Sequence, residues 1–104
     1  MARHAVSLGF ALEIPHGYVS RILDRSGMAI KNGIHCLAGV VDAGYRGEYK
    51  AIMINLGDEP YKIEKGDRVA QMLIQPVEIC EIKEVEELSN SERGEGGFGA
   101  SGKK

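Results

Sequence analysis

Residues 6–14 read VSLGFALEI, in which large apolar residues alternate with small or polar ones. Successive side chains of a strand point to opposite faces of the sheet, so this period of two predicts a half-buried strand. The turn residues Pro15, His16 and Gly17 end it. An amphipathic helix would repeat its apolar residues every three or four positions, and this stretch does not.

Further β-rich runs follow, separated by Gly, Pro and Asp. They are Tyr18–Leu23, Ile34–Leu37, Val40–Val41, Tyr49–Asn55, Tyr61–Glu64, Arg68–Gln75 and Val77–Val85. Only Glu84–Leu88 fits a helical turn. Many short strands between turn residues predict an all-β sandwich or jelly roll, because the helical stretches that βαβ units need are missing.

The length, charge and composition of the chain exclude several classes of protein. A chain of 104 residues fits one domain, and subunit association would help so small a chain to bury a core. A net charge of −2 argues against nucleic-acid binding. We find no apolar run that could span a membrane and no secretory signal, so we expect a cytoplasmic protein. Cys36 and Cys80 fit neither a disulfide framework nor a metal site, and we interpret both as buried thiols.

The composition changes near the C-terminus. We expect a β domain over residues 1–88 and a flexible arm over residues 89–104, which are rich in glycine. Composition alone also fits a disordered tail. However, Arg93–Gly102 combines glycines, a cation, an aromatic ring and a hydroxyl, a set that can wrap a phosphorylated ligand.

Three short segments could carry chemistry. In the first, Arg25 could pair with phosphate oxygens, Ser26 could donate its hydroxyl, and Gly27 could allow close approach to the backbone; alternatively, this segment is a polar turn. Asp42 ends an apolar run, where a carboxylate could act as a base on water, or it simply starts a turn. Gln71 shares a face with apolar neighbours and therefore needs a hydrogen-bond partner or a ligand.

The histidines carry less information. His4, His16 and His35 follow no metal-ligand spacing. We expect a structural role for His35, in a half-buried strand.

Four segments, taken in order, resemble motifs of the homotrimeric dUTP pyrophosphatase (dUTPase) family. They are Arg25–Ala29, Gly39–Glu48, Gly66–Gln71 and Arg93–Gly102, and the likeness runs from about Val6 to Gly102. The family's first motif, an Ala-Gly-x-Asp-Leu-type segment, has no counterpart here. The resemblance implies an N-terminally shortened jelly-roll subunit, three of which surround a threefold axis. It also implies active sites at subunit boundaries, closed by the glycine-rich arm.

The resemblance also implies an activity. Asp42 would be the general base that deprotonates the water attacking the α-phosphorus of dUTP, which gives dUMP and pyrophosphate. This reaction limits uracil in DNA and supplies dUMP for dTTP synthesis. Mg²⁺ would be held mainly by the substrate phosphates, without a metal site of the protein's own.

The implied substrate contacts come from all four segments. Val40 and Val41 would line the uracil pocket, Tyr45 would pack under the deoxyribose, and Lys50 would lie near the nucleotide. The phosphate contacts would be Arg25, Ser26, Gly27 and Gln71, with Arg93, Gly99 and Ser101 from the arm. Phe98 would stack over uracil.

Two alternatives remain. Without the first motif, the chain could be a catalytically weak or inactive dUTP-binding trimer, and binding of an analogue without turnover would indicate this. The related dCTP deaminases are a third possibility, which ammonia release from dCTP would reveal. The Gly96–Gly99 arm sequence instead favours the hydrolase branch.

Overall fold

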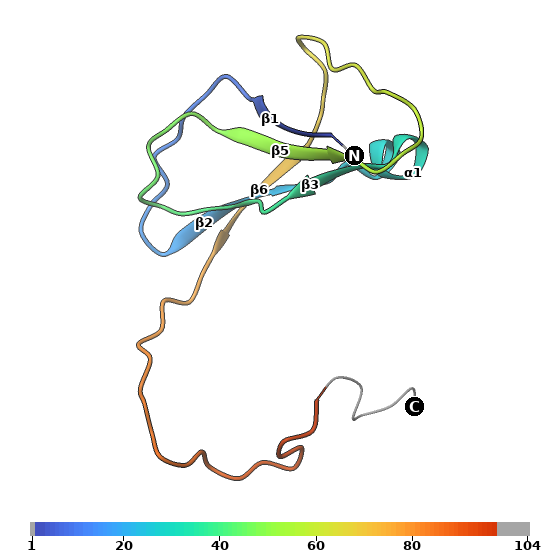
Figure 1. Ribbon diagram of the computed structural model, residues 1–104. Coiled ribbons are helices and arrows are strands. Elements are labelled where there is room, and N and C mark those ends of the chain that lie inside the picture. The colour runs from blue at the N-terminus through green and yellow to red at the C-terminus, as the bar shows by residue number, and fades with distance from the viewer. Residues whose placement is uncertain (1, 98–104) are drawn as a thin grey trace.

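The strands form two antiparallel sheets. The computed structural model describes residues 2–97. The strands are β1 (Arg3–Ser7), β2 (Tyr18–Leu23), β3 (Ile34–Leu37), β4 (Val40–Val41), β5 (Lys50–Asn55) and β6 (Gln71–Pro76), and the helix is α1 (Ser26–Asn32). One sheet has the order β1-β5-β3 and the other β4-β2-β6 (Figure 1). The predicted all-β class is confirmed.

The core draws on both sheets and on α1. In β5 the period of two is plain, because Ala51 and Met53 are buried while Ile52 between them is exposed. Ser20 and Ile22 of β2 point inward in the same way. The buried cluster consists of Ile22, Met28, Ile34, Cys36, Tyr49, Ala51, Met53 and Val69.

The first predicted strand, residues 6–14, is wrong in its bounds: β1 begins earlier, at Arg3, and shares only Val6 and Ser7 with the prediction. β1 ends at Ser7, because Gly9 adopts a positive φ of 81° that interrupts the extended backbone. The chain nevertheless stays beside the residue that precedes β5: Leu8 donates its N–H to the Tyr49 carbonyl at 2.9 Å. The alternation also survives, since Leu8 and Leu12 pack against the core and Ile14 is buried.

The sequence analysis missed the helix. We treated Arg25–Ala29 as a loop segment, but α1 begins at Ser26 and buries Met28. It ends at Gly33, whose φ of 69° is left-handed and whose N–H donates to the Ala29 carbonyl. This glycine C-cap was visible in the sequence and was the overlooked signal.

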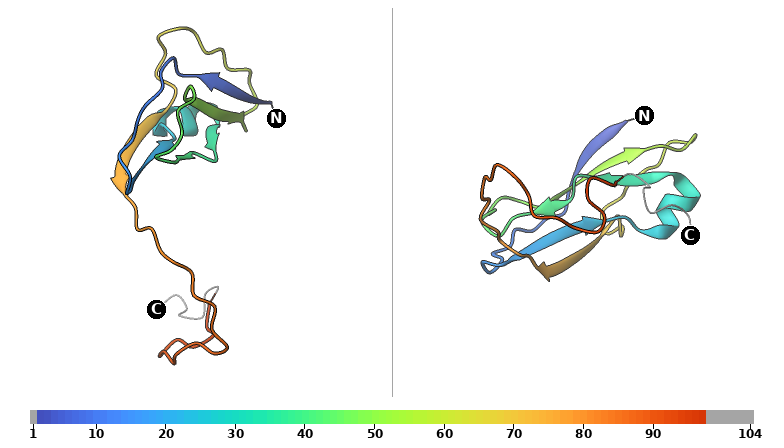
Figure 2. Two further views of the ribbon diagram at one scale, coloured as in Figure 1. Left: turned by 90° about the vertical axis from the view of Figure 1, so that its left-hand side faces the viewer. Right: turned by 90° about the horizontal axis from the view of Figure 1, so that it is seen from below.

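Three further expectations were wrong. Tyr61–Glu64 and Val77–Val85 form no strands, and Glu84–Leu88 forms no helical turn. After Pro76 the chain runs away from the sheets (Figures 1 and 2), with Ile79 64% and Ile82 95% exposed. A strand needs a neighbouring strand for its backbone hydrogen bonds, and this segment has none within residues 2–97.

The two cysteines differ. Both thiols are free, and Cys36 is buried as expected. Cys80 is exposed, contrary to our interpretation, because it lies on the segment that leaves the sheets. In the described part of the chain no helix is long and apolar enough to cross a membrane.

Candidate active site

A cationic pocket lies between α1 and the start of β6. Its volume is about 490 Å³. The pocket collects Arg25, Ser26, Gly27 and Gln71, all four of the predicted phosphate-binding residues that precede the arm. The space beside Gly27 is open, with no atom within 4 Å of an added Cβ. The structure therefore brings these residues together from segments far apart in the sequence.

Two further cations line the cationic pocket, Lys31 and Arg68. Lys31 lies four residues after Gly27 and therefore on the same helix face. Sequence reasoning missed it because it missed α1. Arg68 lies inside the predicted segment Gly66–Gln71, and its charge was the available signal. Among the described residues, no acidic side chain lines this pocket, and its three cations make it suited to an anion.

Gln71 has the partner that its position requires. Its Nε2 donates a hydrogen bond to the main-chain carbonyl of Asp24 at 2.6 Å. An amide nitrogen carries two hydrogens, so one remains for a ligand.

A second pocket, here the Asp42 pocket, lies over the connection between β4 and β5. Its volume is about 350 Å³. Every predicted residue of this region lines it: Val40, Val41, Asp42, Tyr45 and Lys50. Ala5, Glu48, Tyr49 and Ile52 complete the lining, which is mainly apolar. The Asp42 carboxylate thus lies at a mainly apolar hollow.

Short-range hydrogen bonds shape the β4–β5 connection. Tyr45 donates its N–H to the Asp42 carbonyl at 3.1 Å and its hydroxyl to the Glu48 carbonyl at 2.8 Å. A side chain at Gly47 would collide with Tyr45, because an added Cβ would lie 2.5 Å from the phenol oxygen. Only glycine at position 47 allows this placement of the Tyr45 ring.

Tyr49 supports the floor of the Asp42 pocket. It is 1% exposed, and its ring contacts those of Phe10 and Tyr45, with centroids 5.3 and 5.9 Å away. Its hydroxyl shares a 2.7 Å hydrogen bond with the buried Ser20 hydroxyl. Ser20 pairs with Val41, which precedes Asp42. Sequence reasoning found no role for either residue.

Asp24 and His35 form a close pair beside the cationic pocket. His35 Nδ1 lies 2.5 Å from one Asp24 carboxylate oxygen, and the other oxygen accepts the N–H of Cys36. Burial acts to raise the pKa of Asp24, but the hydrogen bonds from His35 and Cys36 together lower it below its ordinary value. Burial and the nearby Asp24 carboxylate raise the pKa of the Cys36 thiol to about 11. His35 has the structural role that we expected.

Among the residues that the structure describes, the two pockets share no lining residue. Arg93 lines neither of them and instead bonds the Gly96 carbonyl within its own turn. The other predicted arm contacts, Phe98, Gly99 and Ser101, lie outside the described residues. One chain therefore presents the predicted site in separate parts.

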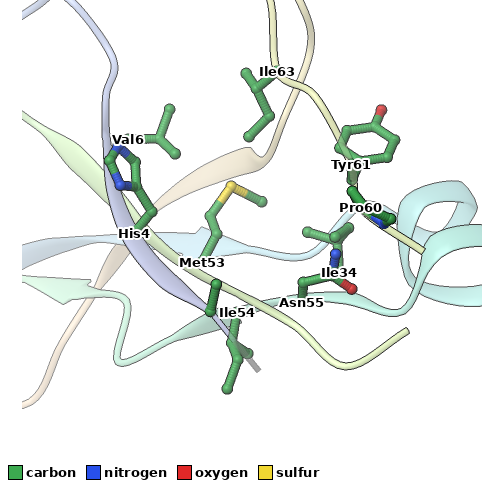
Figure 3. Close-up of a pocket in the computed structure, with 10 residues that line it drawn as sticks. His4, Val6, Ile34, Met53, Ile54, Asn55, Pro60, Tyr61 and Ile63 are labelled. Carbon is green, nitrogen blue, oxygen red and sulfur yellow. The ribbon is translucent and has the colours of Figure 1, made fainter. Parts of the chain in front are cut away.

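A third pocket is apolar and contains none of the predicted site residues that lie within residues 2–97. It has a volume of about 470 Å³ and lies between β1, β5 and the Pro60–Ile63 segment. Met53 lies between the β1 side chains and Ile63 (Figure 3). Within residues 2–97, no cluster of three His, Cys, Asp or Glu side chains could hold a metal ion.

Comparison with known proteins decides the family. A dUTPase family model matches residues 1–102. The chain belongs to the dUTPase family. The antiparallel sheets described above accordingly form a β-jelly-roll-type fold, as in the solved dUTPases that the chain resembles.

Individual dUTPases agree with this. The deoxyuridine 5'-triphosphate nucleotidohydrolase of Rhizobium rhizogenes is 50% identical over 96% of this chain, which spans 65% of that protein. The dUTPase of Staphylococcus bacteriophage 80alpha with dUPNHPP superposes with a TM-score of 0.85 at 32% identity, covering 97% of this chain and 76% of its own.

A third comparison concerns metal. A mutant dUTPase from phage phi11 of S. aureus, solved with a structural Mg(II) ion, matches with a TM-score of 0.72 at 27% identity. The match covers 83% of this chain and 73% of that one. A magnesium ion therefore occurs in a dUTPase of related sequence.

Proposed function

We propose that this chain hydrolyses dUTP to dUMP and pyrophosphate, and thereby limits uracil in DNA and supplies dUMP for dTTP synthesis. One observation carries the proposal: the predicted nucleoside-binding residues share the Asp42 pocket, and the predicted phosphate-binding residues before the arm share the cationic pocket. A cytoplasmic location stays a prediction from the sequence.

The residues have separate tasks in this proposal. Val40 and Val41 flank uracil, Tyr45 packs under the deoxyribose, and Lys50 lies near the nucleotide. Asp42 takes a proton from a water molecule as its oxygen attacks the α-phosphorus. The bond between that phosphorus and the oxygen bridging to the β-phosphorus then breaks, and pyrophosphate leaves with this oxygen. Arg25, Lys31 and Arg68 offset the negative charge of the triphosphate.

Magnesium fits this scheme as an ion that arrives with the substrate. As the sequence predicts, phosphate oxygens and water would supply most of its ligands. The ion would neutralise phosphate charge.

We further propose a homotrimer in which each active site combines the Asp42 pocket of one subunit with the cationic pocket of another. Two observations support subunit contacts. The pockets share no residue within residues 2–97, and β6 exposes Leu73 and Ile74, 46% and 52% respectively. The arm over residues 89–104 would close the site with Arg93, Phe98, Gly99 and Ser101.

The test is pyrophosphate release from dUTP with Mg²⁺, beside dTTP, dCTP and UTP. We expect release from dUTP alone. Asp42→Asn should lower turnover by about 100-fold or more, because the amide cannot take the proton, while the Kd for a non-hydrolysable dUTP analogue stays similar. Asp58→Asn, an exposed acidic residue in a turn, is the matched control.

The other outcomes are distinct. Normal turnover by Asp42→Asn would contradict the assignment of the base. Analogue binding without turnover by the unmodified chain would indicate the binding-only trimer, and ammonia release from dCTP would indicate a deaminase.

A further inference from the structure

Asp24 connects three elements beside the cationic pocket. It follows the last residue of β2 and precedes Arg25. Its carboxylate bonds two consecutive residues of β3, the His35 ring and the Cys36 N–H, each at 2.5 Å. Its main-chain carbonyl accepts the Gln71 amide of β6. Both the side chain and the backbone of Asp24 are therefore fixed.

The carboxylate also joins the two sheets. β2 belongs to the β4-β2-β6 sheet, and β3 is the outer strand of the other sheet. The N–H groups on the outer edge of β3 have no strand partner within residues 2–97, and Asp24 supplies an acceptor to one of them. A carboxylate with two donors is well suited to this task, because an ionised oxygen makes stronger hydrogen bonds than a neutral one.

Arg25 and Gln71 depend on this anchor. Within residues 2–97 the Arg25 guanidinium makes no hydrogen bond or ion pair. The position of this side chain therefore depends on the Arg25 backbone. The Gln71 amide is bonded directly to Asp24. Two of the proposed phosphate contacts are thus directly connected to Asp24, Arg25 along the chain and Gln71 through a hydrogen bond, while Asp24 itself does not line the pocket.

We propose that Asp24 is a positioning residue for the phosphate groups of the substrate: its hydrogen bonds to β3 and β6 hold Arg25 and Gln71 in the cationic pocket. The proposal rests on the proposed function. The negative charge of Asp24 by itself repels phosphate, so charge alone would make Asp24 unfavourable for phosphate binding. Positioning and charge therefore predict opposite effects, and two substitutions can separate them.

The experiment measures the Kd for inorganic pyrophosphate by calorimetry, with the full chain. Both Asp24→Ala and Asp24→Asn remove the charge. Asparagine still accepts the Cys36 N–H and can donate to His35, whereas alanine does neither. We expect Asp24→Ala to weaken binding about tenfold or more and Asp24→Asn to stay within about threefold of the unmodified chain.

Two further variants complete the set. Asp58→Ala, on an exposed turn, should leave the Kd unchanged. His35→Ala removes one of the two side-chain bonds at a half-exposed position and should weaken binding about threefold. If Asp24→Ala does not fold, His35→Ala tests the positioning role of Asp24 instead. An unchanged Kd for His35→Ala would then overturn that role.

The failures are distinguishable. Equal affinities for Asp24→Ala and Asp24→Asn, or tighter binding by both, would overturn the positioning role and leave dUTP hydrolysis intact. If the unmodified chain does not bind pyrophosphate, the positioning role is also overturned. If the unmodified chain binds pyrophosphate but does not hydrolyse dUTP, the proposed hydrolysis fails, and the ratio between the two variants still decides the positioning role.

Discussion

Tyr49 and Ser20 form a buried polar pair that supports the Asp42 pocket. They are the largest fully buried side chains, and their hydroxyl groups bond only 2.7 Å apart. A buried hydroxyl without a partner destabilises the fold. Within residues 2–97 the Tyr49 hydroxyl is bonded to Ser20 alone, whereas the Ser20 hydroxyl also has a longer hydrogen bond, of 3.4 Å, to the Val41 carbonyl.

We therefore predict that Tyr49→Phe lowers the free energy of unfolding by about 1 kcal/mol, because the Ser20 hydroxyl loses its short hydrogen bond. Tyr45→Phe is the matched control. It removes a hydroxyl that bonds the exposed Glu48 carbonyl, and it should cost less. Adding Ser20→Ala to Tyr49→Phe should recover part of the loss. Denaturant unfolding of the four proteins measures this, and equal losses for the two tyrosines would contradict it.

At the scale of the element, α1 is the part of the fold that matters most for the cationic pocket. It places Ser26, Gly27 and Lys31 along one side, and Gly33 ends it. The end is tightly constrained, because a Cβ on Gly33 would lie 2.6 Å from the Gly57 nitrogen.

We predict opposite effects for two glycine substitutions in this element. Gly33→Ala should destabilise the protein by more than about 1 kcal/mol. Alanine would have to adopt the left-handed backbone conformation of Gly33, and its Cβ would clash with a neighbouring backbone. Gly27→Ala meets open space within the helix and should stabilise it by roughly 0.5–1 kcal/mol. Thermal unfolding measures both, and a Tm for Gly33→Ala at or above that of the unmodified chain would contradict the account.

The sequence predicted strands well where a β-rich run also has a partner strand, as in β2 and β5. It predicted strands wrongly at Tyr61–Glu64 and Val77–Val85, because a local pattern does not say whether a neighbouring strand exists. The site residues before the arm were predicted by motif resemblance, and they line two pockets of the structure. Lys31, Asp24 and Tyr49 were missed, since their roles depend on a helix and on contacts between distant segments.

At the scale of the whole molecule, the predicted site residues of one chain lie in two separate pockets. Within residues 2–97 the Asp42 pocket and the cationic pocket have no residue in common, and the segment after Pro76 leaves the sheets with apolar side chains exposed. Both features are accounted for if neighbouring subunits complete each site, which is the central claim of the proposed function.

Mixed trimers test that claim most directly. Asp42→Asn and Arg25→Ala each disable one pocket, so each variant alone should be nearly inactive toward dUTP. When the two are unfolded and reassembled in equal amounts, a site shared between subunits joins two intact pockets in about a quarter of cases. We predict recovery of about that fraction of the activity of the unmodified chain treated in the same way. A mixture that stays as inactive as its two components would show that each site is built from a single chain.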